Sequence, residues 1–303
     1  MIEQKNGSIM KANTASRTAQ YMAFFRALET KRNQRKRLFT DPYAIHFLNK
    51  KLQTISLFSA LPFVHKSIGK IIQRKIPGAY TSGLARTKYI DDLLQQAIAR
   101  GAKHVIILGA GFDTRALRLD FLAGIPVTEI DHPDTASLKI NTLRNTMGQL
   151  PPNVRFLQID FNKQSLEHLF QQNNINFTLP AVIIWEGVTN YLSKTAIDAT
   201  FAVLKNCCSG SSVIFTYVDN KVFSDPASFY GAEKLLEDLS AIEESWTFGF
   251  DPPALPAYLQ QYHYHLLEDK GAATYRQLYT PERKALNTGY EFYRVGFARK
   301  IDG

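Results

Sequence analysis

Glycines and acidic side chains follow a series of short apolar runs in this sequence. Gly109 and Gly111 come directly after HVIIL, Asp131 ends PVTEID, Asp160 ends VRFLQID, and Glu186 follows PAVIIW. In an open parallel sheet, ligands bind beyond the carboxyl ends of the strands. We therefore expect these groups to share one crevice, with bare backbone at the glycines and carboxylates at the neighbouring strand ends.

Each group has a chemical role that suits a nucleoside. Gly109 and Gly111 have no Cβ atom, so their backbone can approach a ribose or an amino-acid moiety closely. Asp131 lies about 20 residues beyond the glycines, the usual spacing of a carboxylate that binds ribose hydroxyls. Asp160 can accept a hydrogen bond from an adenine amine while the Phe161 backbone meets the edge of the ring.

The charges distinguish between two adenosine ligands. Thr114 stands where a dinucleotide fingerprint has its third glycine, and Asp113 lies where a pyrophosphate would sit. S-adenosylmethionine has no phosphate but carries an ammonium and a sulfonium, which Glu186 would attract. The pattern therefore favours S-adenosylmethionine over a nicotinamide dinucleotide, which would have indicated a reductase.

Each carboxylate also has a purely structural alternative. Asp113 could cap the following helix, and Asp131, before His132 and Pro133, could form a turn. Glu186 could pair with a buried arginine. Because the acidic residues recur at successive strand ends, the joint pattern still favours a ligand site.

The elements that must position these groups alternate between strands and helices, which predicts an α/β fold with a mostly parallel sheet. The last two strands are expected to close the sheet as an antiparallel pair, and Ser193 is placed to cap a helix. The expected strands cover 104–111, 126–131, 154–160, 180–187, 211–218, 262–270 and 291–300. The expected helices cover 18–31, 85–101, 133–147 and 193–207, and residues 114–122 are expected to begin a further helix.

The chain divides into two parts in this prediction. Residues 1–100 form a helical lid, or cap, and residues 101–303 form the core, with an aromatic-rich insertion at about 220–256. Residues 52–72 are interpreted as an amphipathic covering helix, with a helix that lies on a membrane surface as the alternative. Pro62 and several basic residues interrupt this stretch, so we expect no membrane span.

The composition narrows the class of protein. With 45% hydrophobic and 21% charged residues in 303, an ordered globular chain is expected. The neighbouring Cys207 and Cys208 provide neither a disulfide framework nor the spacing of a metal site, so no metal is expected. Together with a polar start that lacks a signal peptide, they predict a cytoplasmic protein.

The net charge of +9 raises the question of nucleic acid, because basic residues cluster at 31–37. No nucleic-acid motif and no basic surface interleaved with aromatics accompany this cluster. We therefore expect a small-molecule partner and no nucleic acid. The sequence leaves the oligomeric state open.

Several motifs resemble those of the leucine carboxyl methyltransferase family, and most closely its bacterial S-adenosylmethionine-dependent branch. They are LGAGFDTRALRL, EIDHP, QIDF and EGVTNYL, with EFYRVGFARK similar to the closing strand of the family. SRTAQYMAFFRALE and DPYA resemble its N-terminal lid. The resemblance implies a class I methyltransferase core, which is a Rossmann-like sheet, with a helical lid and S-adenosylmethionine as cofactor.

The resemblance also implies roles for individual residues. Arg86 would hold the carboxylate of the cofactor, and Arg17 matches a lid position that can reach the cofactor. Phe161 stands where this branch more often has Leu, which alters the shape of the adenine slot. The candidate cofactor-binding residues are Arg17, Arg86, Gly109, Gly111, Asp131, Asp160, Phe161 and Glu186.

The expected reaction is O-methylation of a small molecule. A carboxylate acceptor is already anionic at neutral pH, whereas a hydroxyl needs a general base, and no His/Asp dyad is evident. Tyr191 and Tyr21 are candidates for orienting the acceptor, with packing against the lid as the alternative for each.

Other functions fit parts of the pattern. Related family members modify a tRNA base side chain, which the basic run at 31–37 would support. The family also contains methyltransferases that act on the C-terminal carboxylate of a protein. A chain that binds the cofactor without catalysis is the alternative outside the enzymes.

Overall fold

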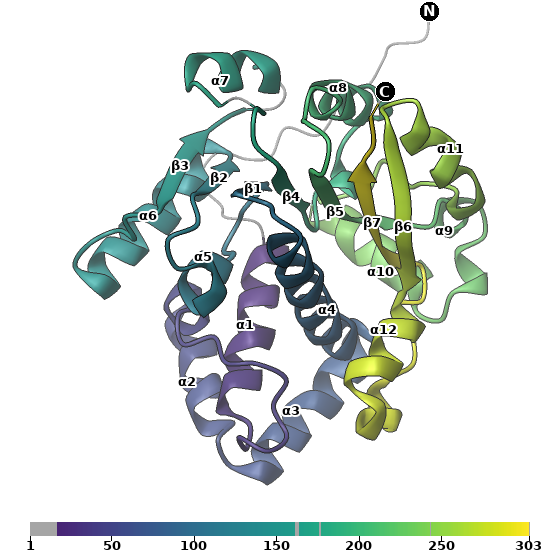
Figure 1. Cartoon of the computed structure of the whole chain (residues 1–303). Coiled ribbons are helices and arrows are strands. Elements are labelled where there is room, and N and C mark those ends of the chain that lie inside the picture. The colour runs from purple at the N-terminus through teal and green to yellow at the C-terminus, as the bar shows by residue number, and fades with distance from the viewer. Residues whose placement is uncertain (1–16, 161–163, 176, 243, 303) are drawn as a thin grey trace, which may run out of the picture.

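The computed structural model describes residues 17–160, 164–175, 177–242 and 244–302. In this part of the chain, one sheet has the strand order β3-β2-β1-β4-β5-β7-β6 (Figure 1). The strands β1 to β5 pair in parallel, and β7 pairs antiparallel with both β5 and β6. The strands are β1 His104–Leu108, β2 Val127–Asp131, β3 Val154–Gln158, β4 Ala181–Trp185, β5 Ser212–Val218, β6 Tyr264–Gly271 and β7 Tyr293–Lys300.

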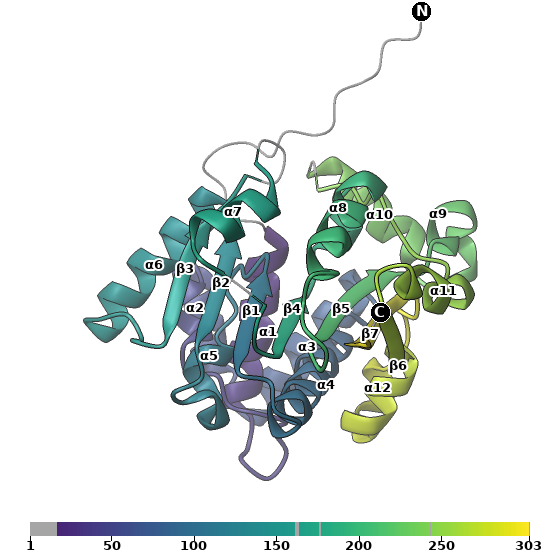
Figure 2. The ribbon, with the colours of Figure 1, turned by 45° about the horizontal axis from the view of Figure 1, so that its top comes forward.

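Helices cover both faces of the sheet (Figures 1 and 2). The longest is the one that precedes β1, and the one that follows β1 has only four residues. The α-helices are α1 Arg17–Lys31, α2 Lys50–Phe58, α3 Pro62–Lys75, α4 Ala79–Ala99, α5 Arg115–Arg118, α6 Pro133–Met147, α7 Leu166–Gln172, α8 Lys194–Leu204, α9 Lys221–Ser224, α10 Ala232–Ala241, α11 Leu255–Gln260 and α12 Ala272–Tyr279.

The central strands are buried on both sides. Every residue of β4 and of β5 is buried, as the apolar run of β4 and the mostly apolar sequence of β5 predict for strands covered by helices on two faces. Helices α7, α8 and α11 contribute to the core on one face, and α4 and α12 contribute to the core on the other. The predicted α/β class and the antiparallel closing pair are confirmed.

The first three helices pack beside α4 and share a separate hydrophobic core with it. Phe24, Phe25 and Leu28 of α1 pack there with Tyr80 and Leu84 of α4. Because α4 belongs to both cores, this layer is joined to the rest of the molecule through shared side chains. Its division from residues 101–303, and its role as a lid, stay predictions.

The expected helix over 52–72 is two helices, α2 and α3, and the prediction of one helix is wrong. Pro62 begins α3 because the proline ring suits the first turn of a helix and lacks the N–H that a helix interior needs. The cap at Ser193 is confirmed, since its side chain accepts a hydrogen bond from the Ala196 N–H. None of the helices in the described residues has the length and apolarity needed to cross a bilayer.

Candidate functional site

The turn after β1 depends on glycine. Gly109 has φ +64°, and a Cβ atom there would lie 2.3 Å from Cγ2 of Val188. Gly111 has φ +47°, and a Cβ atom there would lie 3.7 Å from the Cβ of Ala19 in α1. Gly187, after β4, has φ +73° with open space beside it. The strand ends of β1 and β4 therefore meet closely, with α1 alongside and bare backbone exposed between them.

Asp131 at the end of β2 faces this turn. Its carboxylate accepts hydrogen bonds from the N–H of Gly111 and, over 2.6 Å, from the N–H of His132. Burial raises the pKa of Asp131, and the two backbone N–H groups only partly oppose that shift. A buried carboxylate held by neutral donors is suited to accept from further neutral donors such as hydroxyls.

The third strand end is described only in part. Asp160 is half-buried beyond β3, and its N–H donates to Oε1 of Gln164 over 3.1 Å. Phe161, the other residue expected at the adenine, lies outside the described residues. The side chain of Arg17, at the start of α1, also lies outside them.

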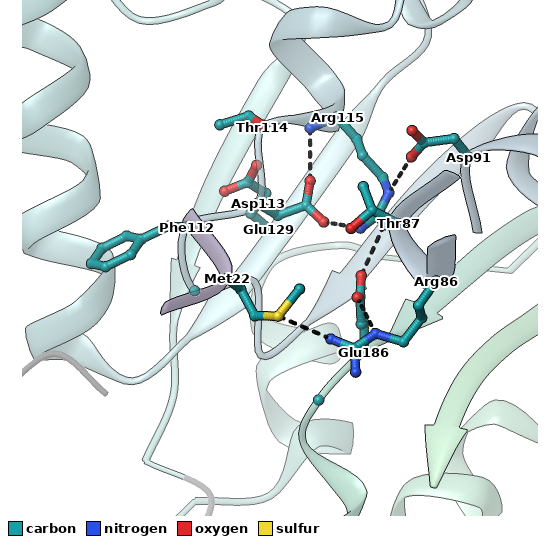
Figure 3. A network of polar contacts seen from close by, with 12 residues as sticks. Met22, Arg86, Thr87, Asp91, Phe112, Asp113, Thr114, Arg115, Glu129 and Glu186 are labelled. Atoms are coloured by element: carbon teal, nitrogen blue, oxygen red, sulfur yellow. Dashed lines mark hydrogen bonds and ion pairs between the residues drawn. The ribbon is translucent and has the colours of Figure 1, made fainter. Parts of the chain in front are cut away.

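Glu186 at the end of β4 is clamped between two arginines (Figure 3). Its Oε1 lies 2.8 Å from Nε of Arg86, and its Oε2 lies 2.8 Å from Nη2 of Arg115. Burial alone would raise the pKa of Glu186, but Arg115 and Arg86 lower it below the usual value. The alternative that Glu186 pairs with buried arginine is thus what the structure shows.

The network continues around Arg115, whose side chain is almost fully buried. Its Nε lies 2.8 Å from Oδ1 of Asp91, and its Nη1 contacts Asp113. Asp113 also accepts from the backbone N–H of Arg115 over 2.7 Å, an Asx-turn contact just before α5, whose N-cap residue is Thr114. Arg118 adds a second cation at Asp91, at 2.7 Å.

Arginines compensate the charges of both Glu186 and Asp113. The place of Glu186 at the cofactor stays a prediction. Burial would raise the pKa of Asp113, yet Arg115 lowers it to about 2. The signal was present in the motif FDTRALR, where Arg115 and Arg118 follow Asp113 by two and five residues. Sequence reasoning missed Arg115 because its partner Asp91 comes from a distant helix.

Helix α1 lies over these strand ends. Nη2 of Arg86 donates to Sδ of Met22 over 3.6 Å, and the Tyr191 hydroxyl donates to Oγ1 of Thr18 over 3.4 Å. The two candidates for acceptor orientation are therefore placed differently. Tyr191 lies in this contact region, whereas Tyr21 is 48% exposed.

Aromatic rings border Arg86 on its other side. The guanidinium lies 4.7 Å from the centroid of the Tyr293 ring, and Tyr290 stacks on Tyr293 at 5.6 Å. Trp246 meets Tyr293 at 6.2 Å, and its buried indole N–H lies near the Tyr191 hydroxyl. Burial raises the pKa of Tyr191 to about 12, so its hydroxyl stays protonated and available as a donor.

A family model described as leucine carboxyl methyltransferase matches residues 19–205, which include most of α1, the glycine turn and Glu186. The chain belongs to the leucine carboxyl methyltransferase family. It is 28% identical over 292 residues to a Bacillus subtilis protein, YktD, named as an S-adenosyl-L-methionine-dependent methyltransferase. That match covers 89% of this chain and 90% of the relative. A relative of the same name from Mycolicibacterium paratuberculosis is 30% identical over 218 residues, covering 71% and 78% of the two chains.

Solved structures agree on the fold. A Thermobifida fusca crystal structure, described as that of a methyltransferase, matches with a TM-score of 0.56 and 16% identity over 79% of this chain and 89% of its own. A protein from Streptomyces avermitilis, described as a DUF574 family member, also has a TM-score of 0.56, at 12% identity over 78% and 91%. The family and the named relatives together make this chain an S-adenosylmethionine-dependent methyltransferase.

Proposed function

We propose that this methyltransferase transfers the methyl group to an oxygen atom of a small apolar acceptor, and that the oxygen belongs to a carboxylate. The observation that carries the proposal is the cluster of aromatic side chains beside Arg86. Tyr191, Tyr290 and Trp246 offer apolar surface together with O–H and N–H donors. Such a cluster suits contact with an apolar body that ends in an acceptor of hydrogen bonds.

The residues at the strand ends fit the cofactor. Arg86 has one strong acceptor among the described residues, Glu186, and a weak one in Met22, so its fork retains donors for the carboxylate of the cofactor. Asp131 would take the ribose hydroxyls, and the glycine turn would lie against the cofactor. Asp160 and Phe161 would hold the adenine. Arg17 is proposed only as a further contact from α1.

The role of Glu186 in this proposal is to position Arg86. With one oxygen on Arg86 and the other on Arg115, it fixes the direction of the Arg86 guanidinium from two sides. When bound, S-adenosylmethionine supplies a methyl group on a sulfonium, which the acceptor oxygen displaces in line. The chain itself then has to orient the acceptor and exclude water.

A carboxylate acceptor fits the protonation of the surrounding groups. Burial raises the pKa of both Tyr191 and Tyr290, so these phenols donate hydrogen bonds and are poor bases. Among the described residues, no histidine forms a hydrogen bond with Arg86, Glu186 or Tyr191. A carboxylate needs no deprotonation, and a protonated phenol can orient one of its oxygens.

Helix α1 would act as the lid. Its residues Thr18 and Met22 contact Tyr191 and Arg86, so a closed α1 would keep water from the reacting groups.

The test is transfer of a labelled methyl group from S-adenosylmethionine to a panel of apolar acids and to matched alcohols. We expect label on the acids, in a product that releases methanol in mild alkali, since esters hydrolyse there and ethers do not. Alkali-stable label on the alcohols alone would refute the carboxylate assignment. Label on tRNA or on a protein C-terminus would favour those alternatives, and binding of S-adenosylhomocysteine without transfer to a cell extract would favour a non-catalytic role.

A further inference from the structure

Helices α2 and α3, with the turn between them, present apolar side chains to solvent. Leu57 and Phe58 at the end of α2 are 54% and 61% exposed, and Leu61 and Phe63 at the start of α3 are 46% and 69% exposed. An apolar group of this kind, contiguous in the chain, marks an interaction site more often than single exposed side chains do.

The same segment carries cations and no acidic side chain. Residues 49–77 contain six Lys or Arg and neither Asp nor Glu. Phe63, Lys66, Lys70 and Arg74 are exposed, and their spacing of three to four residues places them on one face of α3, with the exposed Ile71 next to Lys70. The outer face of α3 is therefore apolar and cationic together.

The opposite face of α3 anchors it to the protein. Ile68 and Ile72 pack against the N-terminal core, and Gly69 is buried, where a Cβ atom would lie 3.3 Å from Cδ1 of Leu286. His65 also shares a hydrogen bond of 3.1 Å with the Tyr80 hydroxyl of α4. Because the inner face of α3 is packed against the protein, its apolar and cationic face points to solvent.

A second basic segment lies at the same end of the molecule. The loop after α1, which contains Arg35 and Lys36, lies near the lower ends of α2 and α3 in Figure 1 and projects away from them in Figure 2. Arg32 at its start pairs with Glu282 at 3.1 Å, whereas Arg35 and Lys36 are exposed. The loop therefore adds exposed cations to the N-terminal part of the molecule.

We propose that the α2–α3 segment, residues 50–75, docks on an anionic phospholipid bilayer. Phe58, Leu61 and Phe63 would enter the boundary between headgroups and acyl chains, to a depth of about 5–10 Å. Lys66, Lys70 and Arg74 would lie at the level of the phosphates, where anionic lipid attracts them. The chain then binds at the surface of the bilayer, without a spanning helix in its described part.

Two other occupants fit less well. A second copy of this chain would bring six cations against six, which charge repulsion opposes. A nucleic acid would neutralise the cations but leave Leu57 and Leu61 in water. Only an anionic surface with an apolar interior satisfies both halves of the pattern.

The experiment uses the full chain and sedimentation with vesicles. Vesicles of phosphatidylcholine with about one third phosphatidylglycerol are compared with vesicles of phosphatidylcholine alone. We expect binding to the anionic vesicles, weakened in 0.5 M salt because screening shortens the range of the attraction. Absence of binding at low salt, or equal binding to both kinds of vesicle, would overturn the proposal.

Two double variants separate the two contributions. The first double variant combines Phe58→Ser with Phe63→Ser, and the second combines Lys66→Glu with Lys70→Glu. Each should lower partitioning to anionic vesicles by at least about tenfold, since each removes more than ~1.4 kcal/mol of attraction. Matched controls are Leu138→Ser with Leu179→Ser, which are 44% and 60% exposed elsewhere, and Lys205→Glu with Lys234→Glu. The controls should bind as the parent does, and all four should keep its melting temperature.

A fluorescent reporter tests insertion directly. Trp185 and Trp246 are buried, at 0% and 9% exposure, so Phe58→Trp adds an exposed indole whose emission should shift to the blue on anionic vesicles. An unshifted emission in the bound state would contradict insertion. Tighter binding of tRNA than of anionic vesicles, or a dimer abolished by the Phe58/Phe63 changes, would assign the face to another partner.

Discussion

The two ends of the proposed cofactor site are built in opposite ways. At the end of β4, Glu186 lies between Arg86 and Arg115, and its pKa is lowered once the arginines outweigh burial. At the end of β2, Asp131 has backbone N–H donors as its close partners, and burial raises its pKa. The Glu186 carboxylate is neutralised by arginines of the protein, whereas the Asp131 carboxylate can still accept hydrogen bonds from neutral donors of a ligand.

Because of this difference, we expect Glu186 to contribute mainly to the stability of the fold and Asp131 mainly to the binding of the cofactor. Removing one member of a buried ion pair leaves the other charge uncompensated, which typically costs more than the pair contributed. Removing a carboxylate whose close partners are backbone N–H groups costs the fold much less, because the lost partners are weaker. We therefore expect changes at the Glu186 end to unfold the protein, and changes at Asp131 to empty the site.

The largest effect is expected for Arg115→Met. Asp91, Asp113 and Glu186 would lose their shared cation in a buried setting, so the free energy of unfolding should fall by about 3–5 kcal/mol. Urea unfolding followed by circular dichroism measures this change. Arg35→Met, in an exposed loop, is the matched control and should stay within about 0.5 kcal/mol of the parent. A similar loss in both variants would remove the distinction.

The next effect is expected for Asp131→Asn. The amide keeps an oxygen for the Gly111 N–H, but its NH2 group cannot accept from the His132 N–H, and it loses the charge that strengthens hydrogen bonds to ribose, each of which contributes about 1.5–3 kcal/mol. Affinity for S-adenosylhomocysteine, measured by calorimetry, should fall roughly a hundredfold, with a smaller loss of stability than in Arg115→Met.

Glu186→Gln is the partner experiment. It leaves Arg86 and Arg115 without their shared carboxylate, so stability and affinity should fall together. If Glu186→Gln left stability unchanged while Asp131→Asn lowered it, the two ends would have exchanged roles.

The sequence predicted the frame of this site better than its electrostatics. Strand ends could be located because apolar runs stop at Gly109, Asp131 and Glu186, and those stops follow from local chain chemistry. The partner of Arg115, Asp91, lies 24 residues earlier in α4, and only packing of α4 against the sheet brings the two together. Pairing across such a distance has no local signature, so the sequence offered an arginine partner for Glu186 only as an alternative and did not identify Arg115.

The helices α1 to α3 give a second example of a feature that depends on packing and that the sequence pattern did not predict. The apolar periodicity of residues 52–72 was recognised as amphipathic, but Pro62 divides it into two helices. Which apolar residues remain in water depends on how α3 packs against α4, so the exposure of Phe58 and Phe63 emerges only in three dimensions.

The pH dependence of cofactor binding is expected to be a smaller effect, and it distinguishes Asp131 from Glu186 because their pKa values shift in opposite directions. The ribose contact requires the Asp131 carboxylate to be charged, and its folded pKa is raised, so affinity should be complete above that pKa and decline as the pH falls through it. Glu186, with a lowered pKa, stays charged over the same range. Titration of S-adenosylhomocysteine between pH 4.5 and 8 measures the decline, which Asp131→Asn should abolish.

The sign of the effect on stability is opposite. Since the folded pKa of Asp131 lies above the unfolded value, folding favours the protonated form. Its contribution to stability is therefore present below the unfolded pKa and lost as the pH rises through the folded one. A parent whose stability rose over that interval because of Asp131 would contradict the raised pKa.

The smallest effect is expected for Tyr191→Phe, which changes the proposed contact with the methyl acceptor. Tyr191→Phe removes a hydroxyl that contacts Thr18 and lies near Trp246, whereas Tyr21→Phe removes one from a side chain that is 48% exposed. We expect kcat/KM for the acceptor to fall about tenfold for Tyr191→Phe, the equivalent of one well-made hydrogen bond, and to stay unchanged for Tyr21→Phe. Initial rates under saturating cofactor measure both. Because Tyr191 would contact the acceptor and not the cofactor, affinity for S-adenosylhomocysteine should be the same in the two variants. A loss of that affinity with Tyr191→Phe would move the residue from the acceptor to the cofactor.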